Sequence, residues 1–420
     1  MLNGDRTVKL TLLWVALLCC VSALGRAAPQ LSDKQIIKEI NRHRPLLGAQ
    51  IPEDIKDRLG TTHVGGKYYL TNEPFLLEGS RQVQEFGFGV IKLWFRSDSD
   101  RFYSFNSDWD IEADLSLTEV AQHPYWRECF DMPFSTFALS IAGAGIRTTD
   151  ETAAEEAEEV YQLSKYLLEE YRDREITFIL HNWEGDWIFR GGTGPGSQWS
   201  LDAGMGTSGK RKGDPVPGDI TKRIDAMVKW FTARQSGVDR ARKEAGESKC
   251  RVVHAIEANK VLDSMTGIPG IVNSVLPHVE VDMVSWSSYD GLDMTGLNLF
   301  KGIQYIKEHI RPTLYMNGKR IVFIGEIGMP ENTGGKLANE ETIVNRWDAF
   351  LGACLAADVP YIIQWELYCN EPKDRSLKRI MQKRSADELR GFWLIRPDGS
   401  LGFAGEYFDE ILSNPGNRIR

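Results

Sequence analysis

The sequence lacks a phosphate-binding loop after any of its early predicted strands, since its GxGxxG run at 204–209 lies inside a long predicted loop. No GxGxxG fingerprint joins an early predicted strand to a helix, and no GxxxxGK[ST] loop occurs. These absences argue against a doubly wound dinucleotide-binding fold, which would show such a loop after one of its first strands. We therefore expect no cofactor.

Cysteine is scarce as well. The chain of 420 residues has 6 cysteines, and none of them forms a CxxC pair or a zinc-like spacing. Two lie in an apolar run near the N-terminus. The others could form disulfides in any of three pairings or remain buried thiols, and the sequence leaves both open. They are Cys129, Cys250, Cys354 and Cys369.

Basic residues do not dominate the composition. Lysine and arginine number 50 against 59 aspartates and glutamates, which gives a net charge of −9. Such an acidic chain is a poor partner for nucleic acid or for an anionic membrane surface. We expect neither as a ligand.

Long apolar runs are absent except for Leu10 to Leu24, which Arg6 and Lys9 precede and small residues follow. This pattern predicts a secretory signal peptide over residues 1–28, cleaved between Gly25 and Pro29. The run is short for a membrane span, and an uncleaved anchor is the alternative interpretation. We therefore expect a secreted or periplasmic protein without stable membrane association after cleavage.

Short apolar segments recur through the rest of the chain, separated mostly by stretches with helical periodicity. This alternation predicts a parallel sheet covered by helices. Eight such units indicate one (β/α)8 barrel over residues 29–420, with an insertion at 185–218. The predicted strands are 46–51, 90–95, 137–142, 176–184, 251–258, 281–289, 321–330 and 361–367.

Acidic side chains fall where the later strands should end, and this face carries the active site in a (β/α)8 barrel. Two carboxyl groups suffice for glycoside hydrolysis, because one can protonate the leaving oxygen while the other attacks the anomeric carbon or activates a water. Aromatic residues at the same ends could give a sugar flat faces to lie on. The acidic candidates are Glu184, Glu257, Asp290, Glu326 and Glu366; the aromatic ones are Trp94, Trp183, Trp187, Trp286 and Trp365.

Two other function classes fit the same residues. A metal-dependent barrel, such as a sugar isomerase or hydrolase, would use Glu184, Glu257, Asp290 and Glu326 as ligands with His181 or His254. No HxH spacing supports that alternative, and we expect no metal at the reacting centre. A catalytically inactive glycan-binding barrel is the other alternative.

Several motifs together resemble clan A of the retaining glycoside hydrolases. They are HNWEGDW at 181–187, SSYD at 287–290, FIGEIGMP at 323–330, YIIQWEL at 361–367 and LIRPDGSLG at 394–402. The resemblance implies a (β/α)8 barrel that acts on an oligo- or polysaccharide with retention of configuration. It does not identify a family within the clan.

The resemblance also implies roles for individual residues. Glu326 would be the nucleophile and Glu184 the acid/base, with Trp365 beneath the sugar and Tyr289 supporting the nucleophile. Clan members usually carry Asn directly before the acid, whereas Trp183 here separates Asn182 from Glu184. In an extended strand both would still face one side, so Asn182 could reach the sugar. Glu257 remains an alternative acid/base.

The long stretch 185–218 follows the proposed acid directly, and loops of this length are commonly functional. We expect Trp187 and Trp199 in it to form substrate subsites. An acidic loop further upstream could hold a structural Ca2+, although a solvated loop is the simpler interpretation. Its members are Asp98, Asp100, Asp108 and Asp110.

Overall fold

The structure is a computed structural model of the chain. It describes residues 31–111, 115–194, 196–200, 213–334, 338–378 and 380–419. The predicted signal peptide lies outside the described residues, as does the middle of the predicted insertion at 185–218.

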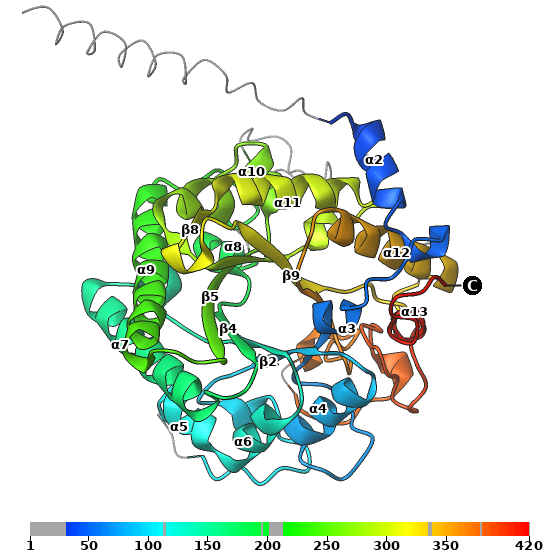
Figure 1. Ribbon diagram of the computed structural model, residues 1–420, viewed down its shortest axis with the longest axis horizontal. Helices are drawn as coiled ribbons and strands as arrows, with labels where there is room; N and C mark the ends of the chain where they lie inside the picture. The colour runs from blue at the N-terminus through cyan, green and yellow to red at the C-terminus, as the bar shows by residue number, and fades with distance from the viewer. Residues whose placement is uncertain are drawn as a thin grey trace, which may run out of the picture.

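Eight parallel strands close into a barrel, and helices surround it (Figure 1), so the predicted (β/α)8 fold is confirmed. The order around the barrel is β1-β10-β9-β7-β5-β4-β3-β2. The strands are β1 (Leu59–His63), β2 (Val90–Trp94), β3 (Thr136–Ser140), β4 (Thr177–His181), β5 (Arg251–Ala258), β7 (Met283–Ser287), β9 (Ile321–Ile327) and β10 (Ile362–Gln364). A separate two-stranded sheet pairs β6 (Glu280–Val281) with β8 (Arg311–Pro312).

The helices follow the strands much as the hydrophobic periodicity predicts. They are α2 (Asp33–Asn41), α3 (Ile55–Arg58), α4 (Phe75–Glu85), α5 (Leu117–Gln122), α6 (Pro124–Asp131), α7 (Asp150–Glu170), α8 (Gly185–Arg190), α9 (Ile220–Ala245), α10 (Val261–Met265), α11 (Leu297–His309), α12 (Glu340–Ala356) and α13 (Phe403–Leu412). Helices α5 and α6 are separate, because Pro124 begins a new helix there.

The first predicted strand is wrong. Residues 46–51 form a 3-10 turn and a loop instead, and Leu47 is 57% exposed. The first strand is LGTTH at Leu59–His63, which is buried throughout. Gly60 permits a close approach to β2, because a Cβ there would lie 2.4 Å from the carbonyl oxygen of Val90. The sequence LGTTH has no apolar run, so the hydrophobic pattern did not identify this segment as the first strand.

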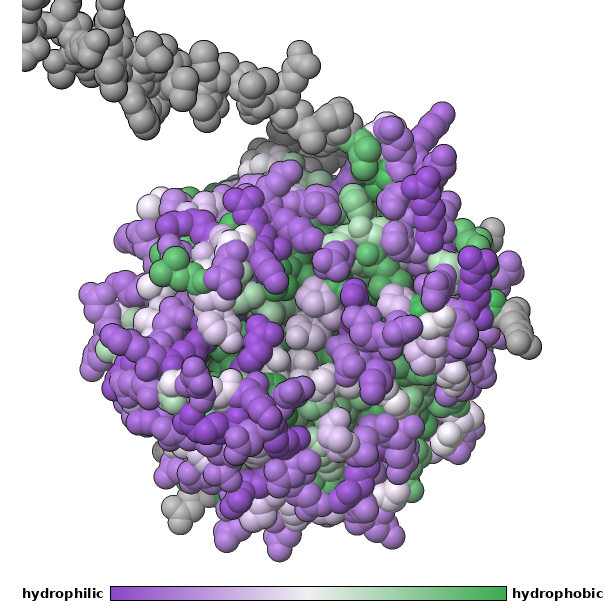
Figure 2. All heavy atoms as spheres, in the orientation of Figure 1, coloured by the Kyte–Doolittle hydropathy of each residue, from purple (hydrophilic) through white to green (hydrophobic). Residues whose placement is uncertain are grey.

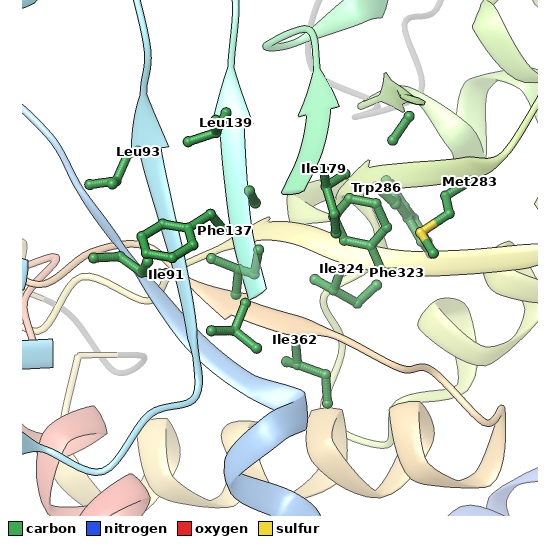
Figure 3. Packing of buried hydrophobic residues seen from close by; sticks show 14 of the residues in the cluster. Ile91, Leu93, Phe137, Leu139, Ile179, Met283, Trp286, Phe323, Ile324 and Ile362 are labelled. Carbon is green, nitrogen blue, oxygen red and sulfur yellow. The ribbon is translucent and has the colours of Figure 1, made fainter. Parts of the chain in front are cut away.

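Alternation along the strands divides the core into two layers. Ile91 and Leu93 of β2 pack outward with Phe137 and Leu139 of β3 (Figure 3), whereas Lys92 between them points into the barrel. The inner layer near the carboxyl ends is therefore polar, and it is there that the candidate site is built.

The face in Figure 2 is mostly hydrophilic, with hydrophobic side chains in small separate groups. In the described part of the chain, no helix is both long and apolar enough to cross a membrane. The four cysteines named above are all buried free thiols. The buried-thiol interpretation is thus the one the structure supports.

Candidate active site

A cleft with a volume of about 1100 Å³ opens at the carboxyl ends of the barrel strands. It brings together Glu184 and Glu326, the two carboxyl groups predicted as catalytic. Aromatic side chains line the same cleft, as predicted for most of them. They are Trp94, Phe102, Trp183, Trp187, Tyr289 and Trp365.

Glu326 lies at the bottom of this cleft with three side-chain donors around it. Lys92 Nζ donates to its Oε2 at 3.1 Å, and Trp183 Nε1 donates to the same oxygen at 3.1 Å. Tyr289 Oη donates to Oε1 at 3.3 Å. Burial raises the pKa of Glu326, while the Lys92 charge and these hydrogen bonds oppose the rise and favour the carboxylate.

A β-bulge aims Glu326 into the cleft. Trp286 of β7 pairs with Ile324 of β9, but the next residue, Ser287, pairs with Glu326, so Gly325 is an extra residue in β9. Without the bulge, strict alternation would turn Glu326 toward the helices. Only glycine fits, because a Cβ at position 325 would lie 1.9 Å from Ser285 Oγ.

Glu184 has a contrasting environment in the same cleft. Among the described residues, its carboxyl group has no hydrogen-bond or ion-pair partner, and it lies three residues beyond the end of β4. Burial, reinforced by the charges of Glu326 and Glu257, raises the pKa of Glu184 to about 8. Of the two cleft carboxyls, Glu184 is therefore the one that keeps its proton near neutral pH.

Glu257, the alternative acid, does not line the cleft. Its side chain is fully buried, where Oε1 accepts the backbone N–H of Glu184 at 2.6 Å and Oε2 accepts Ser285 Oγ at 2.9 Å. Lys92 Nζ lies 3.6 Å from Oε2. Glu257 thus holds the backbone of Glu184 and shares Lys92 with Glu326, but it presents no oxygen to a substrate.

Asn182 is also held away from the cleft, so the expectation that it contacts the sugar is corrected. Its Oδ1 accepts the backbone N–H of Glu257 at 3.0 Å, and its side chain is fully buried. The assumption of an extended chain fails here. Strand β4 ends at His181, and Glu184 adopts a left-handed conformation with φ 50° and ψ 61°. The side chains of Asn182 and Glu184 consequently diverge.

Two of the predicted aromatic platforms are core residues. Trp286 is fully buried, packs against Gly291 and Gly302, and donates to Asp290 Oδ1 at 3.1 Å. Trp199 is 1% exposed and packs on Phe189. Neither has a free face for a sugar, so their assignment to the substrate-binding surface is corrected.

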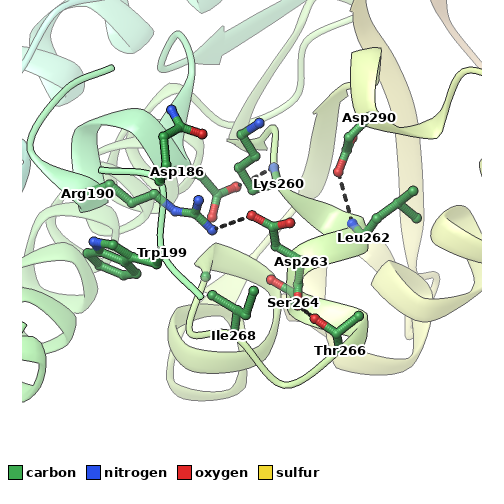
Figure 4. A network of polar contacts seen from close by, with 12 residues as sticks. Asp186, Arg190, Trp199, Lys260, Leu262, Asp263, Ser264, Thr266, Ile268 and Asp290 are labelled. Atoms are coloured by element: carbon green, nitrogen blue, oxygen red, sulfur yellow. Dashed lines mark hydrogen bonds and ion pairs between the residues drawn. The ribbon is translucent and has the colours of Figure 1, made fainter. Parts of the chain in front are cut away.

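A polar network fixes the segment that carries Glu184 and Trp187 (Figure 4). Asp186 of α8 accepts the backbone N–H groups of Asn259, Lys260 and Ile271 at 2.8, 3.0 and 2.9 Å. Arg190 at the end of α8 donates to Asp263 at 2.9 Å. The network ties α8 to the segment after β5, and Lys260 Nζ lies 4.4 Å from the Trp187 ring.

Two of the residues proposed as metal ligands, Asp290 and His254, are held apart from the others by contacts of their own. Asp290 accepts Leu262 N–H and Trp286 N–H, and His254 faces Gln235 of α9. In the described ranges, no three His, Cys, Asp or Glu side chains are grouped so as to hold a metal ion. The Lys92 ammonium group occupies the position between Glu257 and Glu326 where a cation would neutralise both. In the acidic loop upstream, Asp98 pairs with Arg96 and Arg101.

Lys92 is the functional residue that the sequence analysis missed. Its side chain is fully buried, and its pKa is raised because Glu257 and Glu326 outweigh the cost of burial. A lysine within the apolar strand VIKLW was a usable signal, since lysine is rarely buried without an anionic partner. The resemblance implied only Tyr289 as a partner of the predicted nucleophile.

No family model and no curated protein sequence matches the chain. Solved structures to which it is similar include glycoside hydrolases. A GH5-4 broad specificity endoglucanase from Clostridium acetobutylicum is 11% identical, with 86% of this chain and 99% of that chain covered and a TM-score of 0.45. The catalytic domain of the Bacillus sp. JAMB-750 GH26 endo-β-1,4-mannanase is 14% identical, with 90% of each chain covered and a TM-score of 0.47. CJP38, a β-1,3-glucanase and allergen of Cryptomeria japonica pollen, is 12% identical, with 82% and 97% covered and a TM-score of 0.41.

Proposed function

We propose that the protein is a retaining glycoside hydrolase with Glu326 as nucleophile and Glu184 as acid/base. One observation carries this proposal: two carboxyl groups face one aromatic-lined cleft with opposite environments. Glu326 is surrounded by donors that favour its charge, whereas the Glu184 carboxyl group has no hydrogen-bond or ion-pair partner among the described residues and keeps its proton to about pH 8. Pairs of carboxyls whose surroundings separate their pKa values are the signature of acid and nucleophile roles.

In the first step, Glu326 attacks the anomeric carbon while Glu184 gives its proton to the leaving oxygen. The bond between anomeric carbon and leaving oxygen breaks, and a glycosyl ester forms on Glu326. Lys92, Trp183 and Tyr289 hold the Glu326 carboxylate in place for this attack. Because Glu326 is uncharged as an ester, Glu184 can then lose its proton without the repulsion of a negative charge on Glu326.

In the second step, ionised Glu184 takes a proton from water, which attacks the same carbon and releases Glu326. Two displacements on one carbon restore its configuration. Glu257 and Asn182 contribute indirectly, because they hold the backbone from which Glu184 projects.

The proposed substrate is an oligo- or polysaccharide, because the cleft offers several aromatic faces along its length. Trp187, Trp94 and Trp365 are the platforms we assign to it. We also propose that the protein is exported, on the strength of the charged and apolar pattern of residues 1–28.

The test is a panel of purified polysaccharides and nitrophenyl glycosides, with products and their anomeric configuration analysed by NMR. We expect hydrolysis with retention, abolished in Glu326→Ala and unchanged after exhaustive chelation, since the mechanism places no metal at the reacting carbon. Binding of glycans without turnover would identify an inactive binding barrel instead. Loss of activity on chelation, restored by a divalent metal, would favour the metal-dependent alternative.

A further inference from the structure

The side chains that line the cleft have a positive net charge, whereas the whole chain has a negative one. Six cationic side chains line it, namely Lys67, Arg101, Arg147, Arg375, Lys378 and Arg390. Three anionic ones do so, namely Glu184, Glu326 and Glu371, which leaves a formal excess of 6 − 3 = +3 among the cleft-lining residues. The whole sequence carries −9. A cleft of one sign focuses ligands of the other.

Half of these cations already have local partners. Arg101 pairs with Asp98 and Arg390 with Glu371. Lys67 is 1% exposed and donates to the backbone oxygens of Lys378 and Ile380 at 2.8 and 3.0 Å. Lys67 thereby fixes the backbone of the segment after β10 from which Lys378 projects.

The other three cations have no acidic partner in the described part of the chain. Arg147 ends a 3-10 turn after β3 (Gly145–Arg147), whereas Arg375 and Lys378 lie at a 3-10 turn after β10 (Arg375–Leu377). All three are exposed and line the cleft that holds Glu184. Lys378 is near enough to Glu184 for its charge to oppose the rise in the pKa of that carboxyl.

We infer that the substrate is an anionic glycan, whose carboxylate or sulfate groups bind Arg147, Arg375 and Lys378; the inference rests on the proposed glycosidase function. Arginine presents a planar fork of donors that matches a carboxylate or sulfate, and the lysine adds a point charge. A neutral sugar offers these groups only hydroxyls. Arg147 follows β3, and Arg375 and Lys378 follow β10, so a ligand in the cleft can contact cations from two different segments.

The experiment measures binding and turnover separately. The Glu326→Gln variant, which should bind without hydrolysis, is titrated calorimetrically with acidic oligosaccharides and their neutral counterparts of the same linkage. Uronate oligomers are compared with their carboxyl-reduced forms, and sulfated galactans with desulfated ones, so the two sources of negative charge are distinguished. Wild-type turnover is measured on the same set.

We expect at least one acidic series to bind roughly tenfold or more tightly than its neutral form, as charge-assisted hydrogen bonds imply. Replacing Arg147, Arg375 or Lys378 with Gln should weaken acidic ligands about tenfold each and leave neutral ones unchanged. Lys319→Gln and Arg320→Gln are matched controls, because both residues are exposed at the opposite end of β9 and outside the cleft.

Equal or better binding of the neutral forms, or absence of binding to every acidic oligosaccharide, overturns the inference. Equal effects of the cleft variants and the two controls overturn it as well. Selective acidic binding without wild-type turnover supports the inference and refutes the glycosidase proposal. Turnover confined to neutral glycans overturns the inference and supports the glycosidase proposal.

Discussion

Replacing Lys92 with Met tests the electrostatic design of the site. The Nζ atom lies 3.1 Å from Glu326 Oε2 and 3.6 Å from Glu257 Oε2, and all three side chains are at most 4% exposed. Methionine fills a similar volume but removes the charge, so two buried carboxylates would lose their cation. Breaking a buried pair in this way typically costs about 3–5 kcal/mol of the free energy of unfolding.

Protonation of one of the two buried carboxylates limits this loss of stability and makes it depend on pH. The ordinary pKa of a glutamate is 4.5, and each pH unit above that value costs about 1.4 kcal/mol to keep it protonated, or roughly 3.4 kcal/mol at pH 7. In the variant, one carboxyl has a raised pKa in the folded state and an ordinary one in the unfolded state. The folded variant therefore binds an extra proton between pH 4.5 and 7, and its stability rises as the pH falls.

The assay is urea unfolding of wild type and variant between pH 5 and 7.5. We expect Lys92→Met to be about 3–4 kcal/mol less stable than wild type at pH 7 and roughly 1 kcal/mol less stable at pH 5. The exposed Lys319→Met should change stability by less than about 0.5 kcal/mol throughout. Equal destabilisation by Lys92→Met at both pH values would refute the reasoning.

Three further substitutions test the roles of Glu184, of the β-bulge at Gly325 and of Trp187 in the cleft. Glu184→Gln should lower kcat/KM by roughly 10²–10⁴ for natural leaving groups but spare the first step with strongly activated aryl glycosides. The raised pKa of Glu184 predicts that wild-type activity falls above about pH 8, and pH–rate profiles of the variant should lack this fall. Gly325→Ala would place a Cβ 1.9 Å from Ser285 Oγ and should lower stability by about 2–4 kcal/mol in urea unfolding, whereas Gly218→Ala, which meets nothing within 4 Å, should not. Trp187→Ala should raise KM for long oligosaccharides several-fold with little change in kcat, since stacking on a flat face contributes to binding; unchanged KM would remove this residue from the subsites.

The fold was predictable wherever strands carry an apolar run, and the first strand was missed because LGTTH has none. Its burial depends on Gly60 and on hydrogen bonds such as that from Thr61 to Gln364 at 2.6 Å, which connect residues distant in sequence. The positions of Glu184 and Glu326 followed from the rule that catalytic groups lie after barrel strands. The resemblance implied that Tyr289 supports Glu326, as the structure shows, but the contacts of Lys92 and Trp183 could not be predicted, because these residues come from two other segments.

The roles of Asn182 and Glu257 show where sequence spacing ceases to be informative. The divergence of Asn182 from Glu184 depends on the left-handed backbone at Glu184, a conformation that a non-glycine residue adopts rarely. A period of two residues holds only while the strand continues, and β4 ends before Asn182 and Glu184. Likewise, Trp286 and Trp365 both lie near strand ends in the sequence, yet Trp365 lines the cleft and Trp286 does not.

The most direct test of the central claim is to trap the glycosyl ester. The protein is incubated with a panel of activated 2-deoxy-2-fluoro glycosides, including uronic acid derivatives, and digested for peptide mass mapping. We predict a single adduct, on the peptide that contains Glu326 and on that side chain, formed also when Glu257 is replaced by Gln in a correctly folded variant. An adduct on Glu184 or Glu257, or inverted product from a substrate that the enzyme turns over, would contradict the assignment.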